Sequence, residues 1–227
     1  MATGKVVVPK EKKIRIGVTG SEGLIGWHVW CRLSVEADLI VSTADRRTFL
    51  TPEVMDAFVR DCDVIVHLAG QNRGSDIEIE ETNPALAKEL VDALMRTDNR
   101  PQVLFASSIH IDRDTAYGRS KRKATAILSH WARQMEARFC NLVLPHVYGE
   151  HGRPFYNSVV STFCYQLATG DEPIIEVDGQ LELLHAQDVA EVILSAIRAG
   201  ISGELKPDGV PIRLSPLLAR LRGLSDK

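Results

Sequence analysis

Short apolar runs alternate with amphipathic segments along the first two thirds of the chain. The runs are rich in valine, isoleucine and leucine, and each closes on glycine, serine or aspartate, which is the pattern of short buried strands. We expect strands at residues 13–20, 38–45, 63–70, 102–108 and 141–149. The run DVIVHLAG at 63–70 is almost wholly apolar, as expected when helices cover both faces of a sheet.

Helical periodicity fills the intervals between these strands. We expect helices at residues 23–35, 52–62, 83–97 and 116–138. After Gly149 the alternation weakens, and the remaining helices are expected within 151–173, at 191–200 and at 212–227.

This order of elements predicts an α/β fold, a Rossmann-like doubly wound parallel sheet with a small C-terminal substrate lobe. We divide the chain into a flexible leader at 1–11, a dinucleotide-binding core at 12–150, and a lobe with closing elements of the same domain at 151–227. Ligands of such sheets bind at the carboxyl ends of the strands, so the loops after the strands should surround one site.

Composition narrows the function classes. The net charge of −3 gives no reason to expect nucleic acid or an anionic membrane as partner, and no apolar run is long enough to span a bilayer. The four cysteines are scattered, which favours reduced thiols in a cytoplasmic protein. The seven histidines have no metal-ligand spacing, so we expect no metal site.

The first strand is followed by TGSEGLIG, in which glycines stand at positions 20, 23 and 26. Glycine permits a tight turn and a close approach of the backbone to a ligand, and the next helix offers free N–H groups to a phosphate. This Gly-x-x-Gly-x-x-Gly spacing is a variant of the dinucleotide fingerprint, although a packing turn has the same composition. We expect the loop to contact a cofactor through Gly20, Gly23, Leu24, Ile25 and Gly26.

The end of the second strand offers Asp45, Arg46 and Arg47. An acid there would accept hydrogen bonds from the free 2′-hydroxyl of NAD, whereas an arginine would bind the 2′-phosphate of NADP. Two guanidinium groups favour NADP(H), with NAD(H) as the alternative, and all three residues could also be exposed loop charges.

Tyr117 and Lys121 are four residues apart and share one helix face, just behind Ser108 at the end of a strand. A phenol has an ordinary pKa near ~10, and a nearby ammonium together with an oxidised nicotinamide would lower it. These three groups suit hydride transfer between a nicotinamide and a carbonyl carbon, with Tyr117 passing a proton at the oxygen. A Tyr-x-x-x-Lys pair alone would be an ordinary helix surface pair.

The glycine loop, HLAG at 67–70, Asn83, Ser108 and YGRSK at 117–121 together resemble the extended short-chain dehydrogenase/reductase family, in its sugar-nucleotide branch. The resemblance spans residues 14 to about 190. It implies that the catalytic set is Ser108, Tyr117 and Lys121, the last two also contacting the cofactor. It further implies cofactor contacts from Leu68, Ala69, Gly70, Asn83 and His146. Asn83 would lie near the adenosine end of the cofactor or at a water bound by the catalytic lysine.

A closer resemblance, in HLAGQNR and in FYNSVVSTFCYQLATG, is to the reductase domain of bacterial capsule and O-antigen enzymes. These reduce a UDP-linked 4-keto-6-deoxy-N-acetylhexosamine, generally with NADPH, in the UDP-N-acetyl-L-fucosamine pathway, and generally carry a C-terminal cupin domain. The resemblance implies that this chain is a free-standing reductase or a domain of a longer one.

Two positions depart from the family pattern, because Val143 stands where arginine is usual and His146 where asparagine is common. His146 would donate to the carboxamide or sugar, or only cap a loop. The sequence-predicted substrate contacts are Asn72, Arg73, Ser108, His110 and Asn157. Dehydration is disfavoured, because Ile109 and His110 stand where dehydratases carry an acid pair.

We therefore expect an NADPH-dependent reductase of a nucleotide-linked 4-keto-6-deoxy sugar, acting as a homodimer through the helix of Tyr117. A partner subunit would complete the sugar pocket, or the pocket would be open. The alternatives are an NAD-dependent sugar-nucleotide 4-epimerase, and a non-catalytic dinucleotide-binding or redox-sensing protein.

Overall fold

A six-stranded parallel sheet forms the centre of the computed structural model, which describes residues 12–225. The predicted leader at 1–11 and the last two residues of the predicted closing helix lie outside the described residues. The strand order is β2-β1-β3-β4-β5-β8. The bounds are β1 Ile14–Thr19, β2 Leu39–Ala44, β3 Val64–His67, β4 Gln102–Ser108, β5 Phe139–Leu144 and β8 Gly203–Leu205.

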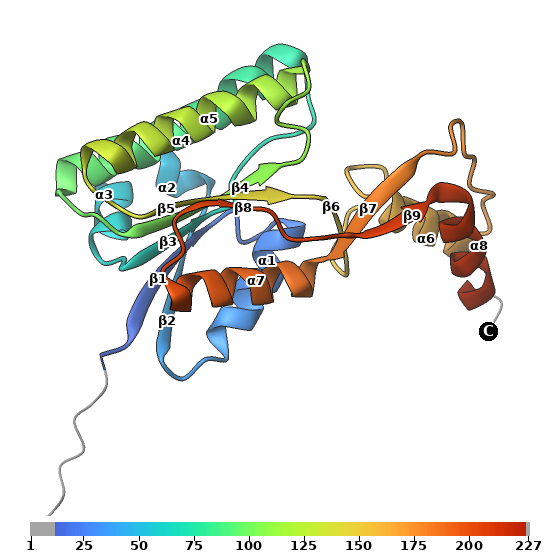
Figure 1. Ribbon diagram of the computed structural model, residues 1–227, viewed down its shortest axis with the longest axis horizontal. Helices are drawn as coiled ribbons and strands as arrows, with labels where there is room; N and C mark the ends of the chain where they lie inside the picture. The colour runs from blue at the N-terminus through green and yellow to red at the C-terminus, as the bar shows by residue number, and fades with distance from the viewer. Residues whose placement is uncertain (1–11, 226–227) are drawn as a thin grey trace, which may run out of the picture.

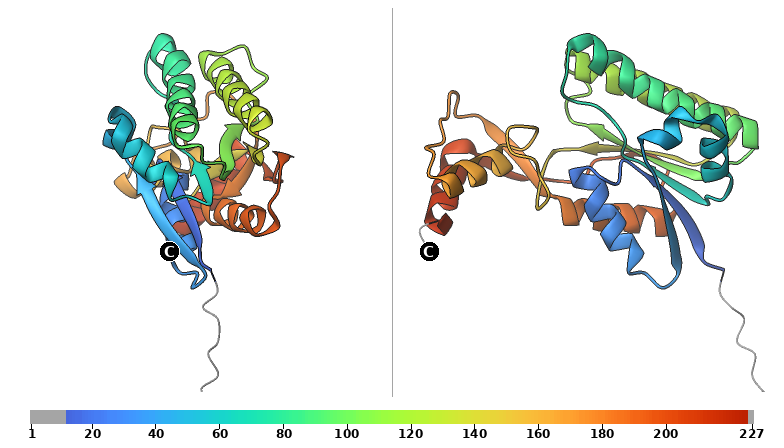
Figure 2. Two further views of the ribbon diagram at one scale, coloured as in Figure 1. Left: turned by 90° about the vertical axis from the view of Figure 1, so that its left-hand side faces the viewer. Right: turned by 180° about the vertical axis from the view of Figure 1, so that it is seen from behind.

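Helices cover both faces of this sheet, as Figures 1 and 2 show. One face carries α1 (Leu24–Ser34) and α7 (Ala186–Ala199), and the other carries α3 (Pro52–Arg60), α4 (Asp76–Thr97) and α5 (Ala116–Gln134). The fold is therefore the Rossmann-like α/β arrangement that the alternating pattern predicts, with helices on two sides of a parallel sheet.

Each face has its own hydrophobic core because successive strand side chains point to opposite sides. Along β4, Val103 and Phe105 join the core under α4 and α5, whereas Leu104 joins the core under α1 and α7. The strand is buried along its whole length, which explains why its sequence is a continuous apolar run.

The order of strands fixes where a ligand can bind. The chain leaves β1 for β2 on one side and returns to β3 on the other, so the connections diverge at the carboxyl ends of β1 and β3. Thr19 and His67 are paired in register at these ends. A crevice opens at such a switch point in doubly wound sheets.

Helix α4 begins earlier than the sequence prediction, which placed its start at Asn83. The Ser75 side chain accepts a hydrogen bond from the backbone N–H of Glu78, and the Glu78 carboxylate accepts one from the backbone N–H of Ser75, which makes a capping box. This box starts the helix at Asp76, and Pro84 lies inside it. The predicted helix at 83–97 would have had this proline in its first turn, whereas here it is an interior residue.

The predicted strand at 141–149 is two strands in two sheets. Pro145 lies between β5 and β6 (His146–Tyr148) and has no N–H to continue the ladder. The second sheet, in the order β6-β7-β9, adds β7 (Gln180–His185) and β9 (Val210–Arg213), two strands that we did not predict.

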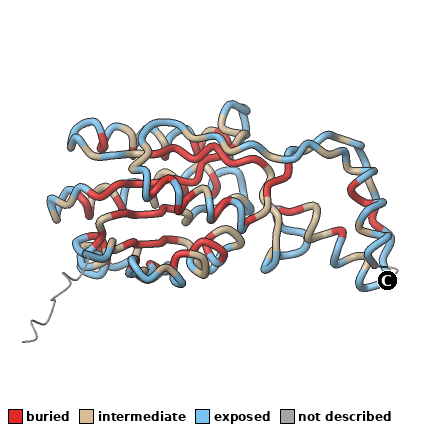
Figure 3. Tube along the Cα trace, turned by 60° about the horizontal axis from the view of Figure 1, so that its bottom comes forward, coloured by how far each residue is buried: buried red, intermediate tan, exposed pale blue. Residues whose placement is uncertain are grey.

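With α6 (Val159–Thr169) and α8 (Leu214–Ser225), this sheet forms a small lobe beyond the end of the main sheet (Figure 1). Figure 3 shows that buried residues run along the central strands and are sparse in the lobe. Its buried apolar side chains include Phe163, Leu183, Leu217 and Leu218. Within residues 12–225, no helix is both long and apolar enough to cross a membrane.

Candidate active site

A cleft of about 670 Å³ lies at the carboxyl ends of the central strands. Its lining comes from the glycine loop after β1, the segment after β3, the end of β4, the first turns of α5, and the links that follow β5 and β6. These are the loops that the sequence places around one site, except the loop after β2, which does not line the cleft.

The glycine loop has a shape that only glycine permits. Gly20 has a φ of +72°, and a Cβ there would lie 2.6 Å from the backbone nitrogen of Ala69. A Cβ on Gly26 would lie 2.0 Å from the carbonyl oxygen of Gly20. The loop can therefore fold onto the start of α1 only without side chains at these two positions.

The first turn of α1 fits a phosphate. Gly23 is its N-cap and offers no side chain to the free backbone N–H groups, and no acidic residue lies in that turn. The positive end of the helix dipole therefore faces the cleft, with Glu22, just before the N-cap, as the nearest acid along the chain. These residues fit the diphosphate of a dinucleotide.

Thr19 and His67 tie the two loops of this crevice together. The Thr19 hydroxyl accepts hydrogen bonds from the backbone N–H of Leu68 at 3.2 Å and of Ala69 at 3.1 Å, and it lies 2.8 Å from His67 Nδ1. Burial lowers the pKa of His67 to about 3, and the charge of Lys121 acts in the same direction, so the ring is neutral. The Thr19–His67 pair thus holds the segment after β3 against the glycine loop.

Ser108, Tyr117 and Lys121 line one cleft together with the glycine loop. Lys121 is buried, and its ammonium donates a hydrogen bond to the carbonyl of Ala106 at 2.8 Å. The same nitrogen lies 5.7 Å from the centre of the Tyr117 ring. Strand β4 therefore supplies the serine and anchors the lysine, while α5 carries the tyrosine.

The pKa of Tyr117 moves opposite to the sequence expectation. Burial raises it to about 12, and the hydroxyl of Ser108 works against the rise. Burial also lowers the pKa of Lys121 to about 8. Because burial dominates, in the protein alone the tyrosine holds its proton more firmly than in water.

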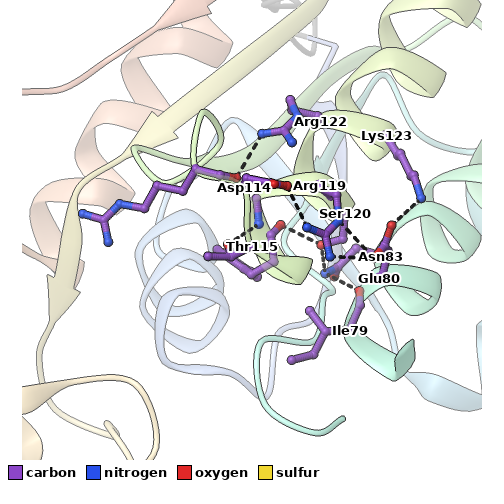
Figure 4. Close-up of polar contacts among 12 residues, drawn as sticks. Ile79, Glu80, Asn83, Asp114, Thr115, Arg119, Ser120, Arg122 and Lys123 are labelled. Carbon is purple, nitrogen blue, oxygen red and sulfur yellow. Dashed lines mark hydrogen bonds and ion pairs between the residues drawn. The ribbon is translucent and has the colours of Figure 1, made fainter. Parts of the chain in front are cut away.

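Asn83 supports this site from behind. It is 2% exposed, and its amide nitrogen donates to Ser120 and to the carbonyl of Gln71, while its amide oxygen accepts from the backbone of Gln71. Figure 4 shows this contact between α4 and α5 beside the ion pairs of Glu80 with Arg119 and Lys123. Asn83 does not line the cleft and lies behind Gly70, and its predicted role at the cofactor stays a prediction.

Comparison with known proteins gives the family. A family model described as the NAD dependent epimerase/dehydratase family matches residues 16–206. The chain belongs to that family.

Two relatives of this epimerase/dehydratase family member carry names from polysaccharide chemistry. The UDP-2-acetamido-2,6-beta-L-arabino-hexul-4-ose reductase of Pseudomonas aeruginosa is 29% identical over 194 residues, which are 83% of this chain and 51% of that protein. The capsular polysaccharide assembling protein CapF of Staphylococcus aureus is 25% identical, with a TM-score of 0.80 over 94% of this chain and 58% of that one. The chain thus spans about half the length of these two relatives.

The match to a third protein, a structural neighbour, spans a larger share of that protein's chain. The UDP-N-acetylglucosamine 4-epimerase of Bacillus cereus has a TM-score of 0.80 at 21% identity, over 94% of this chain and 82% of that chain. At this identity the match supports the fold alone.

The sequence-predicted substrate residues gather in the cleft of this family member. Asn72, Arg73, His110 and Asn157 all line it, and so does His146. The rings of His110 and His146 pack edge to face, with centroids 5.1 Å apart, and each has a buried Nδ1 without a hydrogen-bond partner in the described structure. Their roles stay predictions.

The residues expected at the ribose lie outside this lining. Asp45 caps the short helix α2 (Arg46–Leu50), where its carboxylate accepts from the backbone N–H of Thr48 at 2.9 Å, and this bond holds its pKa below the usual range. Arg46 and Arg47 are exposed in the first turn of that helix. The choice between acid and arginine as the ribose contact stays a prediction.

Sequence reasoning missed several residues of the cleft, among them Arg113 and Arg153. Arg113 lies in the loop between Ser108 and Tyr117, so its place between two predicted site residues could have marked it as a cleft residue. Arg153 follows the strand pair that Pro145 divides, and only the fold shows that this segment returns to the cleft. The Thr19–His67 pair was also missed, because its members are 48 residues apart.

Proposed function

We propose that this protein is an NADPH-dependent reductase of a nucleotide-linked 4-keto-6-deoxy sugar. The observation that carries the proposal is that Ser108, Tyr117 and Lys121 line the same cleft as a glycine loop shaped for a diphosphate. The names of the relatives from Pseudomonas aeruginosa and Staphylococcus aureus support a substrate from nucleotide-sugar chemistry.

The cofactor, when bound, supplies a hydride to the keto carbon. The negative charge that develops on the keto oxygen then needs a proton, and Tyr117 is the donor in this proposal. A pKa of about 12 keeps the phenol protonated at neutral pH, which is the form that reduction requires. Ser108 orients the same oxygen by hydrogen bonding.

In this proposal Lys121 stabilises the phenolate that remains. Its pKa of about 8 leaves it mostly charged near neutral pH, and the distance of 5.7 Å from its nitrogen to the centre of the Tyr117 ring supports this role. In this proposal it also binds the ribose hydroxyls of the cofactor, while Asn72, Arg73, His110 and Asn157 bind the nucleotide sugar.

We prefer NADPH over NADH because Arg46 and Arg47 are exposed beside the end of β2 and make no ion pair within residues 12–225. A guanidinium binds a 2′-phosphate more strongly than a hydroxyl. The homodimer through α5 and the cytoplasmic location are further expectations of this proposal.

The test is a panel of nucleotide-linked keto sugars, each incubated with NADPH or NADH while the absorbance of the reduced nicotinamide is followed. We expect a UDP-linked 4-keto-6-deoxy-N-acetylhexosamine to consume NADPH in proportion to the product formed. Conversion of a sugar nucleotide to its C4 epimer without net consumption would identify an epimerase instead. Cofactor binding without turnover of any panel member would contradict both.

A further inference from the structure

The segment between β6 and α6, residues 149–158, forms one wall of the cleft, and we call it the 149–158 strap (Figure 1). Its residues His151, Arg153, Tyr156 and Asn157 line the cleft opposite the segments that carry the catalytic set. The guanidinium of Arg153 makes no hydrogen bond or ion pair within residues 12–225. The strap therefore offers free polar groups to a ligand.

The backbone of the strap is strained. His151 has a φ of +68° and Phe155 a φ of +56°, in the left-handed region that residues with a side chain rarely adopt. Such conformations persist where surrounding contacts over-determine them. Something outside the strap must hold it in place.

Helix α1, whose first turn faces the cofactor, provides one such contact. His28 is 4% exposed, and its Nε2–H donates to the carbonyl oxygen of Glu150 at 3.0 Å. Because a carbonyl can only accept, Nε2 must carry the proton. This buried bond joins the cofactor helix directly to the strap.

Gly149 lets the strap pass close to that histidine. A Cβ at Gly149 would lie 3.3 Å from Nε2 of His28 and 3.3 Å from Nε2 of His185, and φ there is +155°. The carboxylate of Glu150 lies 3.3 Å from His185, but this side chain is 67% exposed, so the pair adds little. The buried bond from His28 is the stronger contact.

A second contact comes from the same helix. The indole of Trp27 stacks on His151 with centroids 5.5 Å apart and an interplanar angle of 20°. At the other end of the strap, Arg73 Nε donates to the carbonyl of Tyr156 at 2.6 Å. The strap is thus fastened near both ends, and Arg153 lies between the two fastenings.

We propose that His28 is a positioning residue that holds the 149–158 strap, so that Arg153, Tyr156 and Asn157 face a bound nucleoside diphosphate sugar. This inference rests on the proposed function and adds to it a residue outside the cleft. The strap forms the part of the cleft wall that faces the nucleotide sugar, so it affects the affinity for that ligand. The glycine loop affects the affinity for NADPH.

The test measures binding by calorimetry, with NADPH first and then UDP-N-acetylglucosamine as the probe in the presence of saturating NADPH. We expect His28→Ala to weaken the probe about tenfold, the size that follows from losing one buried hydrogen bond. His28→Gln should bind the probe within about threefold of the native protein, because the Gln amide nitrogen has the reach of Nε2. His28→Asn has a shorter reach and should behave like the alanine variant.

Two tryptophan variants keep the test decisive if the histidine variants fold poorly. Trp27→Ala removes the stack on His151 and should weaken the probe about threefold, a modest loss of aromatic contact. Trp30→Ala is the matched control, since Trp30 lies on the same helix and is 41% exposed against 37% for Trp27. The control should bind the probe like the native protein, and NADPH affinity should change less than about threefold in all variants.

Native-like probe affinity in both His28→Ala and Trp27→Ala would overturn the inference while leaving the proposed function intact. Equal loss in His28→Gln and His28→Ala would also overturn it, because the hydrogen bond would then not be the cause. A native protein that binds NADPH but not the probe would contradict the nucleotide-sugar function itself, and the inference with it.

Discussion

The two sides of the cleft, which the proposed function assigns to the cofactor and to the substrate, are built differently. On the cofactor side, buried polar contacts fix each loop, as in the Thr19–His67 pair and in the bond from Lys121 to Ala106. On the substrate side, Arg73, Arg153 and Tyr156 come from links without helix or strand and are partly or largely exposed. The chemistry is therefore held by the sheet, and recognition is left to loops that can vary.

The central sheet and the C-terminal lobe also differ in how far they bury their apolar residues. The central strands are buried on both faces, whereas several large apolar residues of the C-terminal lobe are exposed, including Ile174 at 80% and Val177 at 77%. The lobe can bury little apolar surface of its own. Stability should therefore come from the central sheet, and the lobe should contribute mainly surface.

The largest expected effect is on turnover. Tyr117→Phe removes the proton donor and should lower kcat by about 10² to 10⁴, while NADPH affinity, measured by fluorescence titration, changes little. Tyr165→Phe removes a hydroxyl from the exposed α6 tyrosine and serves as the control. Near-native turnover in Tyr117→Phe would refute the assignment of the donor.

The next largest effect is on the free energy of unfolding, which should depend more on the core of the central sheet than on the C-terminal lobe. Leu90→Ala empties a fully buried position in α4 and should lower the free energy of unfolding by about 2 to 5 kcal/mol. Leu224→Ala, at a position in α8 that is 66% exposed, should change it by less than about 0.5 kcal/mol. Urea unfolding of both variants measures the difference, and similar losses would mean that the lobe is a second stabilising core.

A third effect concerns the buried lysine. The folded pKa of Lys121 is about 8 against an ordinary value of 10.5, so the unfolded chain binds more protons between these pH values. Stability from this group therefore rises with pH across that window. Relative to Lys121→Met, which does not titrate, the native protein should gain about 2 kcal/mol between about pH 8 and about pH 9.5. A constant difference between the two proteins would show that the ammonium is not desolvated.

The smallest effect tests the cofactor preference. Replacing Arg46 and Arg47 together by alanine should weaken NADPH about tenfold, the loss of one charge-assisted contact to a phosphate, and leave NADH nearly unchanged. Fluorescence titration with both cofactors measures this. Equal weakening of the two would assign the ribose contact to Asp45 or to another group.

The sequence predicted five of the six strands of the central sheet, because most of them stand out as continuous apolar runs, and it missed the short edge strand β8. It misplaced the start of α4, since Pro84 has the signature of a first helical turn while the capping box at Ser75 lies eight residues earlier than Asn83. It missed β7, whose alternation of Gln180, Leu181, Glu182 and Leu183 is typical of a strand half exposed to solvent. Short strands of this kind give a weaker signal than the buried ones.

The candidate catalytic residues could be found from spacing, because Tyr117 and Lys121 share a helix face and Ser108 ends a strand. Their electrostatics could not, since the raised pKa of Tyr117 depends on how deeply the fold buries the phenol. Contacts between distant positions were also beyond the sequence, such as the bond from His28 to Glu150 across 122 residues.

The central claim is that a hydride and a proton reach the two ends of one carbonyl in this cleft. The direct test uses NADPH deuterated at C4 of the nicotinamide, with a UDP-linked 4-keto-6-deoxy-N-acetylhexosamine as substrate and mass spectrometry of the product. We predict that the native protein places one deuterium on the former keto carbon and that Tyr117→Phe forms this product far more slowly. A reduced product without deuterium, or the absence of any reduced product while NADPH stays bound, would contradict the account.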